Sequence, residues 1–470
     1  MFSLKRLKNH DYIITISCGL LSILSLVLIY SSTFNAQTLE AGAGTFKKQI
    51  IFFIAGFIIY IVLSTFDIAW IQNLKILAVL FLITIFLLIY VKFFTGEIAS
   101  TNRWITFFGF SFQPAEYAKI TLTIITAAIF SHKETKLASL VEWNKKISAK
   151  KFPRLAKILT LFAKRFPTLP RFLISFSLAL IIVFLVFAQP AFGNSVIILI
   201  LWMSIIFAYA NNQLKILNFS LPLVIIPLVQ WKVINLEFLP DNSEIILFLM
   251  LFLISLIASV KTKLKWYLVI LSLFLALSVK PITLSLWETD FLSTYQKDRI
   301  ETFFGDPEEN PLDAGYQVRQ SKIAIGAGRL FGRGYLQGTQ STLKVLPFAH
   351  TDFIFASLAE QFGLIGSSLL ISIYVVLLIR ILQTASKSKD EFSFLLTVGF
   401  CMMLLLNIFI NIGMNLGKLP VTGVPLPLIS YGGSSVIVNL AGLGLVQATR
   451  KRISIKDISE TLTPSNSPWA

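Results

Sequence analysis

The sequence predicts an all-α, polytopic helical membrane protein, and three observations support this prediction. Of its 470 residues, 55% are hydrophobic and 14% are charged, whereas a soluble domain carries roughly a quarter of charged residues. The apolar residues form continuous runs of about 20 residues, the length with which a helix crosses a bilayer, whereas the strands of a barrel would alternate. Basic residues gather in short segments between these runs, as they do between membrane spans.

Hydropathy and length predict twelve transmembrane helices, with the weakest signal within 213–280. The first run follows Lys5, Arg6 and Lys8 but is too long for a signal peptide and lacks a clear small-residue cleavage site. We therefore expect it to be retained as a span. The predicted spans are 12–32, 49–66, 73–94, 113–131, 172–188, 192–210, 213–232, 243–260, 264–280, 352–381, 393–416 and 425–448.

The distribution of lysine and arginine sets the expected orientation. The segment 132–171 holds 11 basic residues and two acids, and smaller basic clusters occupy 261–265 and 450–452. Basic segments stay on the cytoplasmic side of a membrane. With twelve spans and a cytoplasmic N-terminus, all three clusters lie on that side, and the charge-balanced segment 281–351 lies outside.

These assignments predict one domain. We expect residues 1–450 to form a single transmembrane domain with a basic cytoplasmic loop at 132–171 and a large extracytoplasmic loop at 281–351. Residues 451–470 would form a cytoplasmic tail. Both termini of this multi-pass protein would then be cytoplasmic.

Composition also excludes several kinds of protein. The net charge of +17 is confined to segments between apolar runs, so we expect no nucleic-acid partner. Cys18 and Cys401 both lie inside apolar runs, which argues against a disulfide framework. The three histidines are far apart in the chain, and we expect no metal site built from them.

The strongest candidate for chemistry is Asp352. The segment 311–366 is rich in glycine and polar residues, and it re-enters an apolar run through His350, Thr351 and Asp352. A charge at the rim of a span is costly and therefore a candidate for function. Either Thr351 or Asp352 caps a helix that starts here, or the partly desolvated carboxylate acts as a general base. His350 and Glu360 nearby favour the second interpretation.

Cations in the same segment form a second candidate. Arg319 and Lys322 are three residues apart and share a face if this stretch is helical. Arg329 and Arg333 follow among glycines, and arginine beside open backbone suits phosphate. The alternative is an ordinary solvated loop.

A third candidate surrounds the fourth predicted span. Arg103 and Trp104 lie on the external turn before it, whereas Glu116 and Lys119 lie inside it, three residues apart. Charges inside a span face the bundle or a cavity. Glu116 and Lys119 therefore form either a structural pair or part of a polar cavity.

A fourth candidate is the segment 413–435, which combines several prolines and glycines at membrane depth. Such residues mark broken helices whose freed backbone groups need partners. The segment would line either a transport path or a lipid groove.

These blocks, taken together, resemble the SEDS family, which includes RodA and FtsW. The resemblance runs through most of the predicted spans, and its GTQS block is more similar to elongation proteins of the RodA type than to division proteins of the FtsW type. It implies ten core spans, so we place an extra pair within 213–280. The motifs that carry it are NRW, FQPAEYAK, AGYQVRQSKIAIGAGRLFGRG, GTQSTLKVLPFAHTDFIFASLAEQFGLIG and LPVTGVPLPLISYGGSS.

The resemblance implies a peptidoglycan glycosyltransferase of the bacterial cytoplasmic (inner) membrane. It would polymerise lipid II during cell-wall elongation and cell-shape maintenance, and release undecaprenyl diphosphate. The implied partners are lipid II, membrane lipid, the elongation machinery and a class B penicillin-binding protein, which is a transpeptidase. A divalent cation, Mg²⁺ or Mn²⁺, is a candidate cofactor.

The resemblance also assigns residues. The family's essential aspartate matches Asp352, which is the expected catalytic base. The expected binding residues for substrate and diphosphate are Arg103, Lys119, Arg319 and Lys322. The expected supporting residues are Trp104, Glu116, His350 and Glu360.

Three positions depart from the family pattern. Ala115 replaces a serine, Ala191 replaces an acid, and Phe348 replaces a glutamate close to Asp352. The Ala191 change leaves Glu116 as the expected sole partner of Lys119. Three alternatives stay open: a lipid II flippase or other transporter, a division role, and a scaffold that only recruits its penicillin-binding partner.

Overall fold

A computed structural model describes residues 10–33, 43–95, 103–107, 110–131, 169–189, 191–209, 314–342, 345–388 and 390–462. The chain divides into two compact units. One is formed by Met1–Ile205 together with Gln317–Ala470, and the other by Ile206–Tyr316. Nearly all described residues belong to the first unit.

The described part is mostly helical, which confirms the predicted fold class. Within the described residues, five helices are long and apolar enough to cross a membrane: α1 (Tyr12–Thr33), α2 (Ala43–Thr65, apolar from Gly44), α3 (Leu74–Phe94), α15 (Ile354–Ser386) and α16 (Glu391–Asn415). The other helices that match predicted spans are α4 (Pro114–Ser131), α7 (Leu169–Phe187), α8 (Phe192–Tyr209) and α17 (Gly433–Leu462). The predicted spans 213–232, 243–260 and 264–280 lie outside the described residues, so the count of twelve stays a prediction.

One predicted span begins in the wrong place. The prediction started a helix at 425, but α17 begins at Gly433 and continues to Leu462. Pro425 and Pro427 explain the difference, because proline removes a backbone donor and restricts the residue before it. Residues 416–432 therefore form a non-helical segment, and the helical backbone extends into the predicted tail.

Helix α4 lies in the core of this unit. Every residue from Pro114 to Phe130 is buried except the partly exposed Tyr117. The helix contacts α3, α7, α16 and α17, while α17 packs along α2 and α1 packs on α15. Large apolar side chains on the outer faces of α1, α2, α3 and α15 stay exposed, for example Phe86 and Leu369. Such faces suit contact with lipid.

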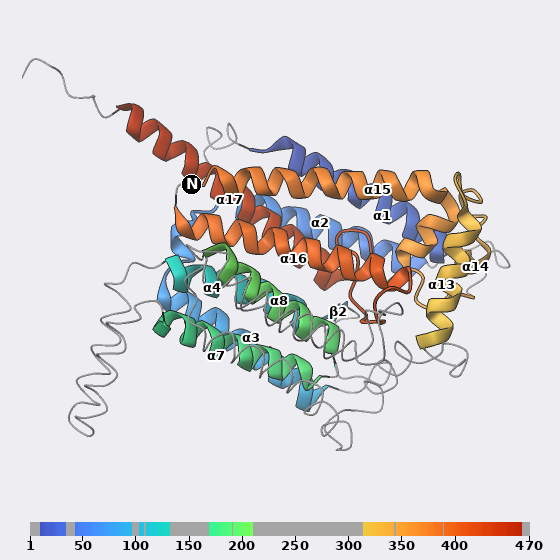
Figure 1. Ribbon diagram of the computed structural model, residues 1–470, viewed down its shortest axis with the longest axis horizontal. Coiled ribbons are helices and arrows are strands. Elements are labelled where there is room, and N and C mark those ends of the chain that lie inside the picture. Colours follow the sequence, from blue (N-terminus) through green and yellow to red (C-terminus); the bar gives the residue numbers. More distant parts are fainter. Residues whose placement is uncertain are drawn as a thin grey trace, which may run out of the picture. The chain divides into compact units, whose positions relative to one another are not determined.

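Short elements connect the helices. A 3-10 helix, η2 (Ile68–Trp70), follows α2, and the strands β1 (Ile105–Phe107) and β2 (Phe110–Phe112) form an antiparallel hairpin before α4. The pairs in register are Ile105 with Phe112, Thr106 with Ser111 and Phe107 with Phe110. This hairpin was not predicted. The helices α13 (Ala314–Gly328) and α14 (Thr339–Thr342) lie at the end of the bundle opposite the start of α1 (Figure 1), which we call the loop end.

Helix α15 is broken at Gly363, which has φ 64° and ψ −159°. The break frees backbone groups on both sides, and an apolar environment requires a partner for each. The segment between α13 and α14 supplies these partners at 2.9 to 3.2 Å. The hydrogen bonds run from the N–H of Leu364, Ile365, Arg333 and Gly334 to the carbonyls of Arg329, Leu330, Glu360 and Gln361, respectively. Residues 354–362 thereby form a short buried helix that is separate from the longer part of α15.

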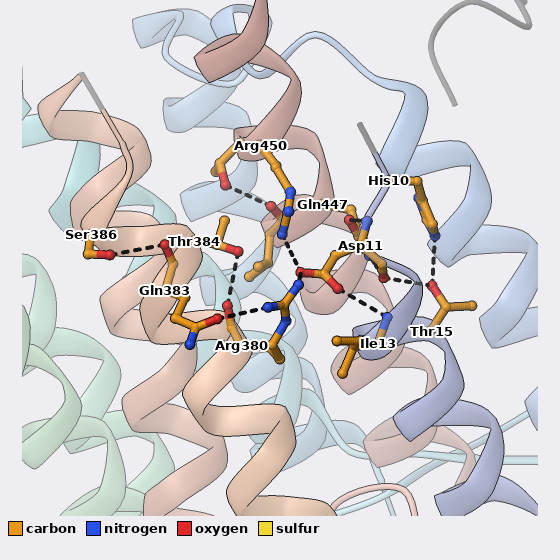
Figure 2. Close-up of polar contacts among 12 residues, drawn as sticks. His10, Asp11, Ile13, Thr15, Arg380, Gln383, Thr384, Ser386, Gln447 and Arg450 are labelled. Carbon is orange, nitrogen blue, oxygen red and sulfur yellow. Dashed lines mark hydrogen bonds and ion pairs between the residues drawn. The ribbon is translucent and has the colours of Figure 1, made fainter. Parts of the chain in front are cut away.

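The other end of the bundle is closed by Asp11 (Figure 2). Its buried carboxylate forms ion pairs with Arg380 of α15, at 2.9 Å, and with Arg450 of α17. The side chain of Gln447 accepts from the N–H of Asp11 at 3.0 Å and donates to its carbonyl at 2.9 Å. Because an unpaired buried carboxylate is strongly unfavourable, these contacts tie the ends of α1, α15 and α17 together.

The break in α15 predicts a strong effect of Gly363→Ala. A Cβ at this position would lie 2.6 Å from the carbonyl oxygen of Leu330 and closer still to the N of Gly332, both backbone atoms. Together with the positive φ, this should lower the free energy of unfolding by at least about 2 kcal/mol. The measurement is the thermal unfolding midpoint of the purified protein in detergent.

A matched control is Gly326→Ala, because Gly326 lies inside α13 with nothing within 4 Å of an added Cβ. This variant should be as stable as the original or slightly more stable, by about 0.5–1 kcal/mol. Equal unfolding midpoints for the two variants would contradict the described break.

Candidate active site

Asp352 lies in the turn that precedes α15, and its side chain is partly exposed. Its backbone carbonyl accepts two hydrogen bonds of 3.0 Å, from the Nδ2 atoms of Asn411 and Asn415 on α16. The first turn of α15 is not capped by Thr351 or Asp352. The N-cap residue is Phe353, which makes no side-chain cap bond, and the N–H of Ala356 donates to Oδ1 of Asn415 at 3.1 Å.

These two asparagines were not predicted from the sequence, because they lie about 60 residues beyond Asp352 on another helix. The one signal for them is that asparagine recurs at a spacing of four within the apolar run 393–416. Polar amides at such a spacing lie on one helix face and need buried partners.

The non-helical segment 416–432 lies against the Asp352 turn. Ser430 Oγ donates to the carbonyl of Thr351 at 2.6 Å, and the N–H of Tyr431 donates to the carbonyl of His350 at 2.9 Å. Gln49 of α2 also contacts this segment, since its Nε2 donates to the carbonyl of Ser430 at 3.4 Å and its Oε1 accepts from the N–H of Gly432 at 3.3 Å. The prediction of broken helices whose backbone finds protein partners is confirmed here.

His350 faces Tyr431, and the centres of the two rings lie 5.8 Å apart. Burial lowers the pKa of His350 below its ordinary value of 6.5. The ring is therefore mostly neutral at pH 7. His350 does not place a full positive charge two residues before Asp352 in the chain.

Arg319 and Lys322 lie on α13, so the helical condition under which they were expected to share a face is met, and both side chains are exposed. Ser321, between them, is buried and donates to the carbonyl of Asn415 at 2.7 Å. Lys322 lies along the turn that ends α16, where a Cβ on Gly417 would be 2.8 Å from its Nζ. Helix α13 thus docks on the same turn of α16 that holds the Asp352 carbonyl.

Glu116 and Lys119 form a fully buried ion pair of 2.7 Å, as predicted. The prediction that Glu116 is the sole partner of Lys119 is wrong, because Lys119 Nζ also donates to Oδ1 of Asn407 at 3.2 Å. Besides the ion pair with Lys119, the carboxylate oxygens of Glu116 have no hydrogen-bond partner within the described residues. The same holds for Nδ2 of Asn407. Buried groups of this kind usually bind water or a ligand, which is consistent with a polar cavity.

Arg103 and Trp104 directly precede the hairpin. Arg103 is buried and its Nε donates to the carbonyl of Gln189 at 3.1 Å, in the turn between α7 and α8, whereas Trp104 is partly exposed. After the hairpin, the N–H of Gln113 donates to Oγ of Ser434 in the first turn of α17 at 2.7 Å. The hairpin therefore links α4, α17 and the turn at Gln189.

Glu360 is completely buried and binds the GTQS block. Its two carboxylate oxygens accept four hydrogen bonds of 2.8 to 3.2 Å. The donors are Thr339 Oγ1, Gln340 N, Ser341 N and Ser341 Oγ. Glu360 thus holds α14 in place.

In the described part of the chain, no three His, Cys, Asp or Glu residues gather where they could hold a metal ion. These residues therefore do not by themselves form a cation site. A divalent cation stays a prediction.

A family model described as cell cycle protein, covering FtsW, RodA and SpoVE, matches residues 11–236 and 211–454. The chain therefore belongs to the SEDS family. This confirms the resemblance, and the second matched segment contains Asp352 together with α13 to α17 up to residue 454.

Named SEDS relatives are similar to the chain over different lengths. Peptidoglycan glycosyltransferase MrdB of Escherichia coli is 45% identical over 197 residues, which cover 42% of this chain and 52% of that relative. The chain thus matches about half the length of MrdB. Peptidoglycan glycosyltransferase RodA of Treponema pallidum is 26% identical over 465 residues, which cover 96% of this chain and 99% of RodA.

Solved SEDS-like structures share the fold. A chain from work described as the structural coordination of polymerization and crosslinking by a peptidoglycan synthase complex has a TM-score of 0.62 at 22% identity. It covers 94% of this chain and 98% of its own length. The crystal structure of the rod shape determining protein RodA of Thermus thermophilus has a TM-score of 0.53 at 20% identity, covering 94% of this chain and 96% of its own.

The contacts of Glu360 predict its effect on stability. Glu360→Leu would leave two backbone N–H groups and two hydroxyls of residues 339–341 without their acceptor, and should lower the free energy of unfolding by about 2–5 kcal/mol. Glu360→Gln keeps an acceptor oxygen and should cost less. The measurement is again the unfolding midpoint in detergent.

The control for the two Glu360 variants is Gln337→Ala, an exposed position shortly before α14. It should change the free energy of unfolding by less than about 0.5 kcal/mol. If Glu360→Leu were as stable as this control, Glu360 would not hold α14.

Proposed function

We propose that the chain is a peptidoglycan glycosyltransferase that polymerises lipid II into glycan strands during cell-wall elongation. The observation that carries the proposal is the arrangement around the last turn of α16, which holds the Asp352 turn on one side and the α13 helix with Arg319 and Lys322 on the other. A base and cations on elements that meet at one turn suit this reaction, because a hydroxyl loses a proton while a diphosphate leaves. The relatives MrdB and RodA, both named peptidoglycan glycosyltransferases, support it.

In the proposed reaction, the Asp352 carboxylate accepts the proton of the acceptor sugar's 4-hydroxyl. The hydroxyl oxygen forms a bond to the anomeric carbon of the donor sugar. The bond from that carbon to the lipid diphosphate breaks, and undecaprenyl diphosphate leaves with the electron pair. A base placed in this way typically contributes about 10²–10⁴-fold in rate.

Negative charge develops on the departing diphosphate, and we assign its stabilisation to Arg319, Lys322 and Arg103. Cations held on a fixed helix are most effective in this role when the bound substrate excludes water from them. Lys119, paired with Glu116, would bind the substrate deeper in the bundle, where the Glu116 carboxylate has its ion pair but no further hydrogen bond within the described residues. A Mg²⁺ or Mn²⁺ ion brought with the diphosphate would add to the positive charge.

The proposed function has a cellular setting. The chain would lie in the bacterial cytoplasmic membrane with its termini in the cytoplasm and the loop end outside. It would work with a class B penicillin-binding protein of the elongation machinery. The similarity to a chain of a peptidoglycan synthase complex supports such a partner, and the MrdB match supports elongation rather than division.

The test is polymerisation of purified lipid II by the chain with its transpeptidase partner, for the unchanged protein and for Asp352→Asn. The unchanged protein should form glycan polymer, and Asp352→Asn should form it at least about 10²-fold more slowly with an unaltered unfolding midpoint. Asp67→Asn is the matched control, because Asp67 is exposed and asparagine can also cap η2.

Two outcomes would contradict the proposal. If Asp352→Asn polymerised lipid II at the rate of Asp67→Asn, Asp352 would not be the base. If the unchanged protein moved lipid II between leaflets without forming polymer, the chain would be a flippase.

A further inference from the structure

The last turn of α16 contacts three other parts of the chain through two asparagine side chains and one backbone carbonyl. Asn411 and Asn415 are one helical turn apart and completely buried. Asn415 contacts the Asp352 carbonyl and the Ala356 N–H with its side chain, and its own carbonyl accepts from Ser321 of α13. Asn411 adds a second bond to the Asp352 carbonyl and donates to the carbonyl of Val424 at 2.8 Å.

The two asparagines also bind each other, which fixes the direction of their amides. Nδ2 of Asn415 lies 2.8 Å from the carbonyl of Asn411 and 3.3 Å from its Oδ1. Since the N–H of Ala356 needs an acceptor and the carbonyl of Asp352 needs a donor, only one orientation of the Asn415 amide satisfies both. The Asn415 amide therefore donates to Asp352 through Nδ2 and accepts from Ala356 through Oδ1.

The contact that indicates a positioning role is the hydrogen bond from the Ala356 N–H to Asn415, which caps α15. A helix begins with unpaired N–H groups, and the usual cap is a short polar side chain just before the helix. Thr351 and Asp352 stand at that place in the chain, yet the Ala356 N–H is bound by Asn415 of another helix. The hydrogen bond that caps the Ala356 N–H therefore comes from α16 and not from the Asp352 carboxylate.

We propose that Asn415, assisted by Asn411, is a positioning residue for Asp352. Its side chain fixes the backbone at Asp352 and caps α15. Its backbone carbonyl binds Ser321 of the cationic helix α13, so the base is held against the same turn of α16 on which the cations are docked. This inference rests on the proposed glycosyltransferase function. A shift of about 1 Å in a reacting group can cost about 10²-fold in rate.

The experiment compares Asn415→Leu and Asn415→Asp with Thr397→Val, a control on the same helix that removes a buried hydroxyl bonded to Thr449. Asn415→Leu loses the side-chain bonds to the Asp352 carbonyl, the Ala356 N–H and Asn411. Asn415→Asp keeps an acceptor for the Ala356 N–H and loses the donor to Asp352. Measured for each are kcat and KM for lipid II polymerisation with the transpeptidase partner, hydrogen exchange of the amides at 351–356, and the unfolding midpoint.

In Asn415→Leu, kcat should fall by about 10²-fold with KM little changed, because substrate contacts persist while the base is displaced. Its Ala356 amide should exchange faster than in the control. Asn415→Asp should keep that amide protected and still lose kcat. If Asn415→Leu does not fold, Asn411→Ala serves instead and should lower kcat without exposing the Ala356 amide.

A kcat of Asn415→Leu equal to that of Thr397→Val would overturn the positioning role, as would a loss confined to KM. Asp352→Asn is measured in parallel to separate the two proposals. If Asp352→Asn is inactive while Asn415→Leu is fully active, only the positioning role fails. If Asp352→Asn is active, the proposed function fails, whatever the asparagine variants show.

Discussion

Non-helical backbone inside an apolar bundle must find hydrogen-bond partners within the protein, and this constraint shapes the loop end of the molecule. Three stretches of such backbone meet there: the break at Gly363, the turn before α15, and the segment 416–432. Each is bound by groups from elsewhere in the chain, namely residues 329–334, the asparagines of α16, and Gln49. The position of Asp352 follows from these bonds, because its carbonyl is one of the groups that had to be satisfied.

Buried charge follows the same rule and fixes the ends of helices. Asp11 joins α1, α15 and α17 at one end, whereas Glu360 holds α14 near the other. Asp11 binds Arg380 near the end of α15, and Glu360 lies near its start. The helix is therefore fixed on both sides of its break at Gly363. Glu116 differs, because its ion pair with Lys119 leaves carboxylate oxygens without hydrogen bonds. We infer that the first two are structural groups and that Glu116 has capacity left for substrate or water.

Local patterns in the sequence predicted much of this architecture. Apolar runs located nine helices of the described part, with ends that agree to within about six residues except in α17. That helix begins late, at Gly433 after the prolines, and continues past its predicted end at 448 to Leu462. The spacing of Glu116 and Lys119 predicted their ion pair, because it depends on one helix alone. The cap from Asn415, the hydrogen bonds of Glu360 to α14 and the partners of the Gly363 break were not predictable in this way. Each joins segments that are distant in the chain, so its existence depends on packing.

The central claim is that Asp352 lies open to the outer side at the loop end. Its most direct test is labelling of Asp352→Cys in spheroplasts by a maleimide that cannot cross the membrane, since the native Cys18 and Cys401 are buried. Ser386→Cys, exposed at the opposite end of α15, is the control. We expect position 352 to react in intact spheroplasts and position 386 to react only after lysis. Reaction at position 352 only after lysis, or in neither state, would contradict the claim.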